Sequence, residues 1–385
     1  MPIYYKKINN NINELDIRFD YSSLERKSIE NACILSDSKS ESVKVDMHTQ
    51  HNEIDQFERL GLMFEKDQDR LNTSLGPIVI NKQLFNQEND DNARMHTNDQ
   101  FLKKRTIIMT YHDIGLNFYS NFRNFFERKN VREMLRNFQI YHINAPGQEV
   151  NAEDLPIGYQ YPSMDQLSEQ LLEICEFYHI QSFIGFGYGS GSNVLSRFAL
   201  NHPNIVEALF VINPSANSST WTEWFYQKCN LRALSNLRPP NGTESMSMPE
   251  SVQDYFIWSL FGNLNQPGRS ISDDVVLFYR KYFKSNTINT KNLSQFIETY
   301  LYRNALSISR EDLQNNFHCP VAVICADHSP HVDDSIKMNA RLNPENSTWI
   351  KLSDCSMPLQ ENPQKLEQVL CLFLQGLGYL VTTKV

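Results

Sequence analysis

The chain has 385 residues, which exceeds the roughly 250–300 residues at which a single hydrophobic core stops growing, so we expect one large domain with a subdomain or tail. A hydrophobic share of 41% and an aromatic share of 11% are sufficient for a large core and exclude a wholly disordered chain. The formal net charge of -9, without a long run of lysine or arginine, argues against nucleic acid as a partner.

We expect neither a membrane span nor a secretory signal. The sequence has no run of about 18 apolar residues, and its first twenty residues lack the apolar stretch of a signal peptide. The seven cysteines are scattered and form no Cys-x-x-Cys pair, which is typical of reduced thiols and argues against a zinc site. These features predict a cytoplasmic protein without metal or cofactor, while peripheral contact with a membrane stays open.

The N-terminal part of the chain is polar. Residues 1–70 show no regular hydrophobic period and are expected to form a largely disordered arm. A strand pattern follows at 76–80 and opens the core. Residues 83–105 are rich in Asn and Asp, which favours a long exposed loop within the core.

From residue 106 onward, short strand patterns alternate with helical ones. A helix is expected to begin after Ser163, where Gln166 completes a capping box, and a second helix follows Gly191. This alternation is typical of βαβ units and predicts a mostly parallel, doubly wound sheet. The expected strands cover residues 106–109, 139–143, 182–186 and 209–212.

The strand pattern stops between residues 214 and 316, where helical segments take its place. Strands return at 320–325 and 347–352, and a helix at 364–374 closes the fold. A helical insertion at this point is how α/β-hydrolases carry a cap over the C-terminal edge of the sheet.

We therefore predict an α/β-hydrolase fold whose core consists of residues 71–213 and 317–380, with residues 214–316 inserted as a helical cap. Trp221 and Trp224 lie three residues apart on one cap helix. Because that spacing places both rings on one face, we expect them to pack inside the fold.

The segment from Gly187 to Gly191 lies between a strand and a helix, where an α/β-hydrolase carries its nucleophile elbow. The nucleophile is the third residue of the pattern Gly-x-Ser-x-Gly, and here that residue is Gly189, which has no side chain. An alternative frame makes Ser190 the nucleophile, but it places the bulky Tyr188 where the turn needs a small residue.

The catalytic acid of this fold should follow the strand at 320–325. If Ala326 and Asp327 match the usual Gly-Asp at the start of that loop, the acid position two residues further on holds Ser329. His112 and Asp113 fall in the loop that contributes to the oxyanion hole, and we expect a structural role for them.

The catalytic histidine of this fold follows the last strand, but no histidine occurs after His331. The usual spacing, read back from Glu361, leads to Ser356. The sequence thus predicts degenerate triad positions at Gly189, Ser329 and Ser356. A serine without an imidazole has no general base to activate it.

Six motifs make the chain similar to one family. Between residues 105 and 379 it resembles the N-myc downstream-regulated (NDRG) family. The motifs are Thr110 to Asn117, Ala145 to Gln148, Gly158 to Pro162, Met164-Asp165, Leu195 to Pro203 and Phe373 to Tyr379.

The resemblance implies an α/β-hydrolase fold with a helical cap, no hydrolase activity, and action through protein partners in the cytoplasm. It also implies a link to differentiation, stress responses or trafficking. On this basis we expect a non-catalytic adaptor or signalling protein. Two alternatives stay open: a cryptic serine hydrolase that uses Ser190, Asp327 and His331, and a small-molecule or lipid binder that uses the cleft under the cap.

Overall fold

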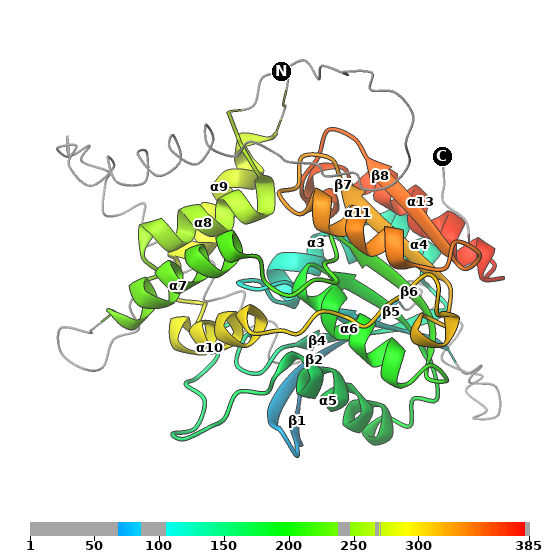
Figure 1. The fold of residues 1–385 in the computed structure, drawn as a ribbon, viewed down its shortest axis with the longest axis horizontal. Coiled ribbons are helices and arrows are strands. Elements are labelled where there is room, and N and C mark those ends of the chain that lie inside the picture. The colour runs from blue at the N-terminus through cyan, green and yellow to red at the C-terminus, as the bar shows by residue number, and fades with distance from the viewer. Residues whose placement is uncertain (1–67, 86–104, 238–246, 266–268, 270, 382–385) are drawn as a thin grey trace, which may run out of the picture. The chain divides into compact units, whose positions relative to one another are not determined.

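A computed structural model describes residues 68–85, 105–237, 247–265, 269 and 271–381. The expectations for the arm up to residue 67 and for the loop at 86–104 concern residues outside this set. The described strands form one eight-stranded sheet in the order β1-β2-β4-β3-β5-β6-β7-β8 (Figure 1). They are β1 (Gln68–Thr73), β2 (Gly76–Leu84), β3 (Thr106–Tyr111), β4 (Phe138–Asn144), β5 (Phe183–Tyr188), β6 (Val206–Ile212), β7 (Val321–Ala326) and β8 (Ser347–Leu352).

The sheet is mostly parallel, as the sequence predicts. Strands β3 to β8 pair in parallel, whereas β1 and β2 form an antiparallel edge beside β4. Strand β1 was not expected, because its sequence QDRLNT lacks the apolar alternation of a half-buried strand. It begins at Gln68, three residues before the expected start of the core.

Helices cover both faces of the sheet, as the alternation of side chains on β5 shows. Phe183 stacks on Phe198 of α6, with ring centroids 5.6 Å apart, whereas Phe186 stacks on Phe125 of α3 at 6.1 Å. Neighbouring odd and even residues of a strand face opposite sides, so α6 and α3 lie on opposite faces. The core helices are the π-helix η3 (Phe118–Arg123), α3 (Asn124–Phe126), α4 (Lys129–Met134), α5 (Met164–Phe177), α6 (Ser190–Asn201), α11 (Val332–Arg341), α12 (Pro358–Glu361) and α13 (Pro363–Gly376).

Helix α5 begins where the sequence predicts it. The Ser163 hydroxyl accepts from the Gln166 backbone N–H at 3.3 Å, and Gln166 Oε1 accepts from the Ser163 N–H at 2.9 Å. This reciprocal pair satisfies two N–H groups that the helix itself leaves free.

The helical insertion lies between β6 and β7 and occupies one side of Figure 1, in green to yellow. No helix in the described part of the chain has the length and apolar character needed to cross a bilayer. The cap elements are α7 (Trp221–Ser235), α8 (Glu250–Phe261), α9 (Asp273–Lys284), α10 (Thr290–Leu301) and the 3₁₀ turn η4 (Leu313–Asn315).

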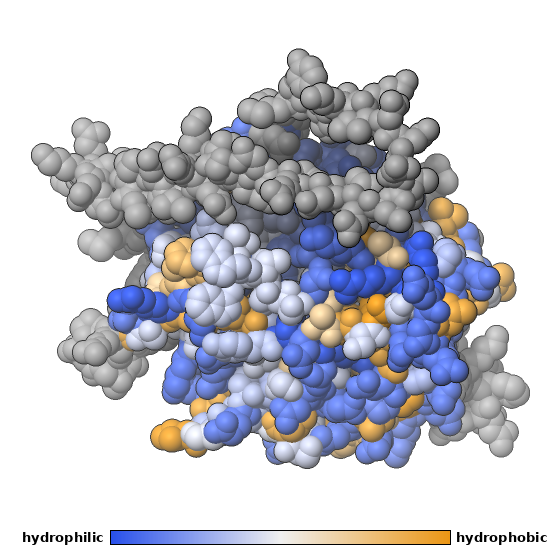
Figure 2. All heavy atoms as spheres, in the orientation of Figure 1, coloured by the Kyte–Doolittle hydropathy of each residue, from blue (hydrophilic) through white to orange (hydrophobic). Residues whose placement is uncertain are grey.

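Helix α7 corrects the expectation that its tryptophans pack inside. Trp221 is 73% exposed and Trp224 is 41% exposed. Figure 2 shows pale and orange residues gathered over the cap helices. The helix instead buries Gln227 and Asn230, whose side chains share a hydrogen bond of 3.2 Å.

An ion pair between the buried Arg303 and the partly buried Glu223 explains the orientation of α7. Arg303 donates to both carboxylate oxygens of Glu223, at 2.8 and 2.9 Å. Glu223, Gln227, Asn230 and Leu234 recur at helical spacing, so they share one face of α7. The pair therefore turns this face inward and leaves the aromatic face outward, which helical spacing alone could not decide.

His142 lies buried on β4, the third strand of the sheet. Its Nδ1 is 2.8 Å from Thr110 Oγ1, and its Nε2 is 3.0 Å from Gln83 Oε1. Burial lowers the pKa of this imidazole to about 3. The folded protein therefore holds His142 in its uncharged form throughout the range in which free histidine titrates.

We expect this histidine to reduce the free energy of unfolding at low pH. Below about pH 6.5 the imidazole binds a proton in the unfolded chain but not in the folded protein. The contribution of His142 to the free energy of unfolding is therefore complete above that pH and falls by about 1.4 kcal/mol for each pH unit below it. Urea unfolding at pH 7 and pH 5 should show a smaller loss in His142→Gln than in the wild type. The exposed His318→Gln should keep the full loss, and equal losses in wild type and His142→Gln would contradict the prediction.

Candidate functional site

Gly189 forms the sharp turn between β5 and α6. Its backbone has φ 53° and ψ −117°, a conformation that residues other than glycine rarely adopt. The next glycine, Gly191, passes so close to the loop after β3 that a Cβ there would lie 2.0 Å from the Tyr111 carbonyl oxygen. The turn thus has the strained strand-to-helix geometry of a nucleophile elbow.

The Asp113 carboxylate fills the space beside this turn. A Cβ built on Gly189 would lie 2.3 Å from Asp113 Cγ and Oδ2. The backbone N–H groups of Ser190 and Ile114 both donate to Asp113 Oδ1 at 2.8 Å. The Asp113 N–H donates in turn to Asn121 Oδ1 on the π-helix, at 3.0 Å. A carboxylate therefore stands where a side chain on residue 189 would begin.

These two N–H groups have a known use in this fold. An α/β-hydrolase forms its oxyanion hole from the N–H of the residue after the nucleophile and an N–H from the loop after β3. Ser190 and Ile114 occupy those chain positions, and Asp113 binds both groups. Burial raises the pKa of the Asp113 carboxyl above its usual value, against the hydrogen bonds, which lower it.

His112 joins two loops beneath this site. The Ala145 N–H donates to His112 Nε2 at 2.9 Å, and Nδ1 lies 2.8 Å from the Asp113 carbonyl oxygen. Because that carbonyl can only accept, the ring proton is on Nδ1. Burial lowers the pKa of His112 to about 4, so the ring is uncharged at neutral pH. Its partners bind both ring nitrogens and leave neither for proton transfer.

The loop after β7 carries the expected acid and the alternative catalytic residues, each with its own partner. Asp327 Oδ1 accepts from the Cys355 N–H at 3.4 Å. The Ser329 hydroxyl accepts from the His331 N–H at 3.2 Å. His331 Nε2 lies 3.2 Å from Ser259 Oγ, which belongs to cap helix α8.

Ser190, Asp327 and His331 do not form one hydrogen-bonded chain in the described structure. The Ser190 hydroxyl is buried, and its acceptor is the His112 carbonyl oxygen at 3.5 Å. His331 instead joins the β7 loop to the cap.

Ser356, at the position expected for the histidine, is fully buried between core and cap. Its hydroxyl donates to the Phe261 carbonyl at the end of α8 (2.9 Å) and accepts from Arg269 Nη2 (2.8 Å). Glu361 accepts from the Ser356 N–H at 2.9 Å and pairs with Arg269 at 3.4 Å. The Arg269 and Glu361 side chains are only 1% and 5% exposed. This cluster ties the cap to the loop after β8.

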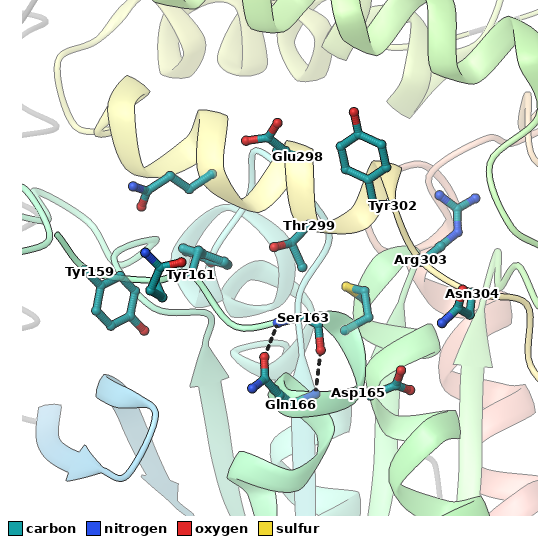
Figure 3. A pocket seen from close by; sticks show the side chains of 13 residues that line it. Tyr159, Tyr161, Ser163, Asp165, Gln166, Glu298, Thr299, Tyr302, Arg303 and Asn304 are labelled. Atoms are coloured by element: carbon teal, nitrogen blue, oxygen red, sulfur yellow. Dashed lines mark hydrogen bonds between the residues drawn. The ribbon is translucent and has the colours of Figure 1, made fainter.

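A cavity of about 440 Å³ lies elsewhere, between the start of α5 and helix α10 (Figure 3). Its walls are mainly polar. Within the described ranges, no group of three or more His, Cys, Asp or Glu residues could hold a metal ion. The labelled lining residues are Tyr159, Tyr161, Ser163, Asp165, Gln166, Glu298, Thr299, Tyr302, Arg303 and Asn304.

Sequence reasoning missed two contributors to this region. It placed Asp113 in the correct loop, but only the three-dimensional structure shows that its carboxylate turns toward Gly189. The sequence did contain one signal: Asp113 directly precedes Ile114, whose N–H group occupies one of the two oxyanion-hole positions. Arg269 gave no signal, because it lies 87 residues from Ser356 in the chain.

Comparisons with known proteins place the chain in one family. The model of the Ndr family matches residues 96–381. Protein NDRG2 of Danio rerio is 35% identical over 281 residues, which cover 73% of this chain and 70% of that protein. Protein NDRG3 of Xenopus tropicalis is 35% identical over 282 residues, or 72% of this chain and 68% of that protein.

Solved structures with a similar fold are hydrolases. A hydrolase from Pseudomonas aeruginosa PA01 matches with a TM-score of 0.57 at 17% identity, over 80% of this chain and 98% of its own. A thermophilic esterase from Thermogutta terrifontis matches with a TM-score of 0.57 at 13% identity, over 81% and 99%. At these identities the likeness establishes the fold alone, and the α/β-hydrolase fold predicted from the sequence is confirmed.

We expect Gly189→Ala to lower the free energy of unfolding by roughly 2 to 4 kcal/mol, because the new methyl group meets the Asp113 carboxylate and the backbone is strained. Gly158→Ala is the matched control: Gly158 has φ 83° but nothing within 4 Å of its Cβ position, so it incurs strain alone. The double variant Gly189→Ala/Asp113→Gly should lose less in urea unfolding than the sum of the two single losses, because the clash is absent once the carboxylate is removed. Strictly additive effects would show that the two positions do not interact.

Glu361→Gln should destabilise the protein by roughly 3 kcal/mol, because it leaves the Arg269 guanidinium buried without a counter-charge. Asp254→Asn removes a comparable but exposed pair with Arg280 (2.8 Å) and should cost less than about 1 kcal/mol. Chemical denaturation measures both. Equal losses in the two variants would mean that the Arg269–Glu361 pair does not hold the cap.

Proposed function

The chain belongs to the Ndr family, and we propose that it is a non-catalytic α/β-hydrolase-fold protein that acts by binding other proteins. The observation that carries the proposal is the Asp113 carboxylate beside Gly189. The carboxylate fills the space in which a nucleophilic side chain would lie. It also accepts hydrogen bonds from both N–H groups that would stabilise a developing oxyanion. A substrate carbonyl would have to displace the Asp113 carboxyl group of the protein itself.

The expected positions of the acid and base support the same proposal. Ser329 and Ser356 offer hydroxyl groups where hydrolysis needs a carboxylate and an imidazole. The Ser356 hydroxyl is already used in two hydrogen bonds between cap and core. Without a base, the buried Ser190 hydroxyl remains a weak nucleophile.

We further propose a cytoplasmic adaptor or signalling role in differentiation, stress response or trafficking. This part rests on the family and on the surface of the cap. Helix α7 exposes Trp221, Trp224 and Phe225 to solvent, and aromatic side chains are the type most enriched among residues that dominate binding energy at protein interfaces.

The alternatives have less support. A cryptic hydrolase would need Ser190, Asp327 and His331 in one hydrogen-bonded chain, yet each has another partner. A small-molecule or lipid binder would need a largely apolar pocket. The cavity beside α10 instead has polar walls.

Labelling of the full-length protein with a fluorophosphonate probe tests the absence of catalysis. We expect the native protein, the heat-denatured protein and Ser190→Ala to show the same background labelling. Specific labelling that disappears in Ser190→Ala would refute the proposal and support the cryptic hydrolase, and His331→Gln would then test its base.

A further inference from the structure

We propose that the oxyanion hole persists in this chain as a carboxylate-binding site, and that the side chain of Asp113 is its resident ligand. The site consists of the Ser190 and Ile114 N–H groups. The inference deepens the proposed non-catalytic function and rests on it. Its test measures anion binding rather than covalent labelling, so the two can fail separately.

The donors come from two independent elements and meet at one oxygen. Ser190 is the first residue of α6, a helix of 12 residues whose N-terminal end carries partial positive charge. Ile114 belongs to the loop after β3. Both N–H groups lie 2.8 Å from Asp113 Oδ1, a normal length for a hydrogen bond to an ionised acceptor. Two donors on one oxygen form an anion site rather than a helix cap alone.

The carboxylate depends on these main-chain groups. In the part of the chain that the structure describes, no lysine or arginine pairs with Asp113. Asn121 holds the Asp113 backbone through its N–H, so the side chain starts from a fixed point. Among the contacts that lower the pKa of this carboxyl, the hydrogen bond from the Ser190 N–H has the largest effect, and the charge of His331, the Ile114 N–H and the Ser190 hydroxyl follow.

Removal of the side chain should leave the site intact but empty. Asp113→Gly deletes one CH₂ group and one carboxylate, which together have the size and charge of acetate. The two N–H groups would then lack an acceptor, which lowers the Tm of the variant because buried donors without a partner destabilise the folded state. Acetate from solution can restore both bonds and stabilise the folded state by mass action.

Thermal unfolding of full-length Asp113→Gly in sodium acetate, with sodium chloride at equal ionic strength, tests the proposal. We expect the Tm of the variant to rise with acetate and to saturate, whereas the wild type responds equally to both salts. Asp254→Gly, which removes an exposed carboxylate, should behave as the wild type. An acetate response no larger than the chloride response in a folded Asp113→Gly variant would overturn the proposal.

A measurement on the wild type covers the case in which Asp113→Gly does not fold. We expect the Ser190 and Ile114 amide resonances to titrate together as the pH falls, because both donate to the same carboxylate. His331 also acts on this carboxyl, so the variants are compared in a His331→Gln background. There Asp113→Asn keeps an oxygen acceptor but cannot titrate, so both resonances should stay constant. Amides that titrate with different midpoints, or that still titrate in Asp113→Asn with His331→Gln, would contradict the proposal.

Discussion

The N–H groups of Ser190 and Ile114 lie at the C-terminal edge of the sheet, and each needs a hydrogen-bond acceptor. The arrangement of the residues around this edge follows from the acceptor that they share. The parallel sheet forces a strand-to-helix turn here, so the end of α6 points its free N–H groups at the loop after β3. In an enzyme, substrate and water meet that need. Here Asp113 meets it, and Gly189 must lack a side chain because the carboxylate takes its space.

The cap extends this arrangement. The loops after β7 and β8 both form hydrogen bonds with residues of the insertion. Ser259 reaches His331, and Phe261 with Arg269 holds Ser356. On the other side, Tyr279 of α9 donates to the Ser120 carbonyl at 2.6 Å and so satisfies a group on the π-helix. Polar contacts at His331 and Ser356 thus join the cap to the core.

The sequence predicts the parts of the fold that repeat a period. Alternating strands and helices identify the parallel sheet, and the Ser163–Gln166 pair marks the start of α5 correctly. The absence of a side chain at Gly189 could also be read directly. The inward face of α7 could not, because it depends on an ion pair with Arg303, far along the chain. The direction of the Asp113 side chain was likewise beyond reach, since it follows from the approach of two loops.

The insertion point of the cap also sets the order in which the sheet can be completed during synthesis. Leu209 of β6 pairs with Val321 of β7, so this ladder can close only after the whole insertion between them has been synthesised. A chain growing from its N-terminus completes β3 to β6 first and leaves β6, which is almost entirely buried in the finished fold, as a bare edge. Bare apolar edges attract other strands. Until β7 is synthesised and pairs with β6, the apolar residues of β6 therefore lack the neighbour that covers this edge in the finished sheet.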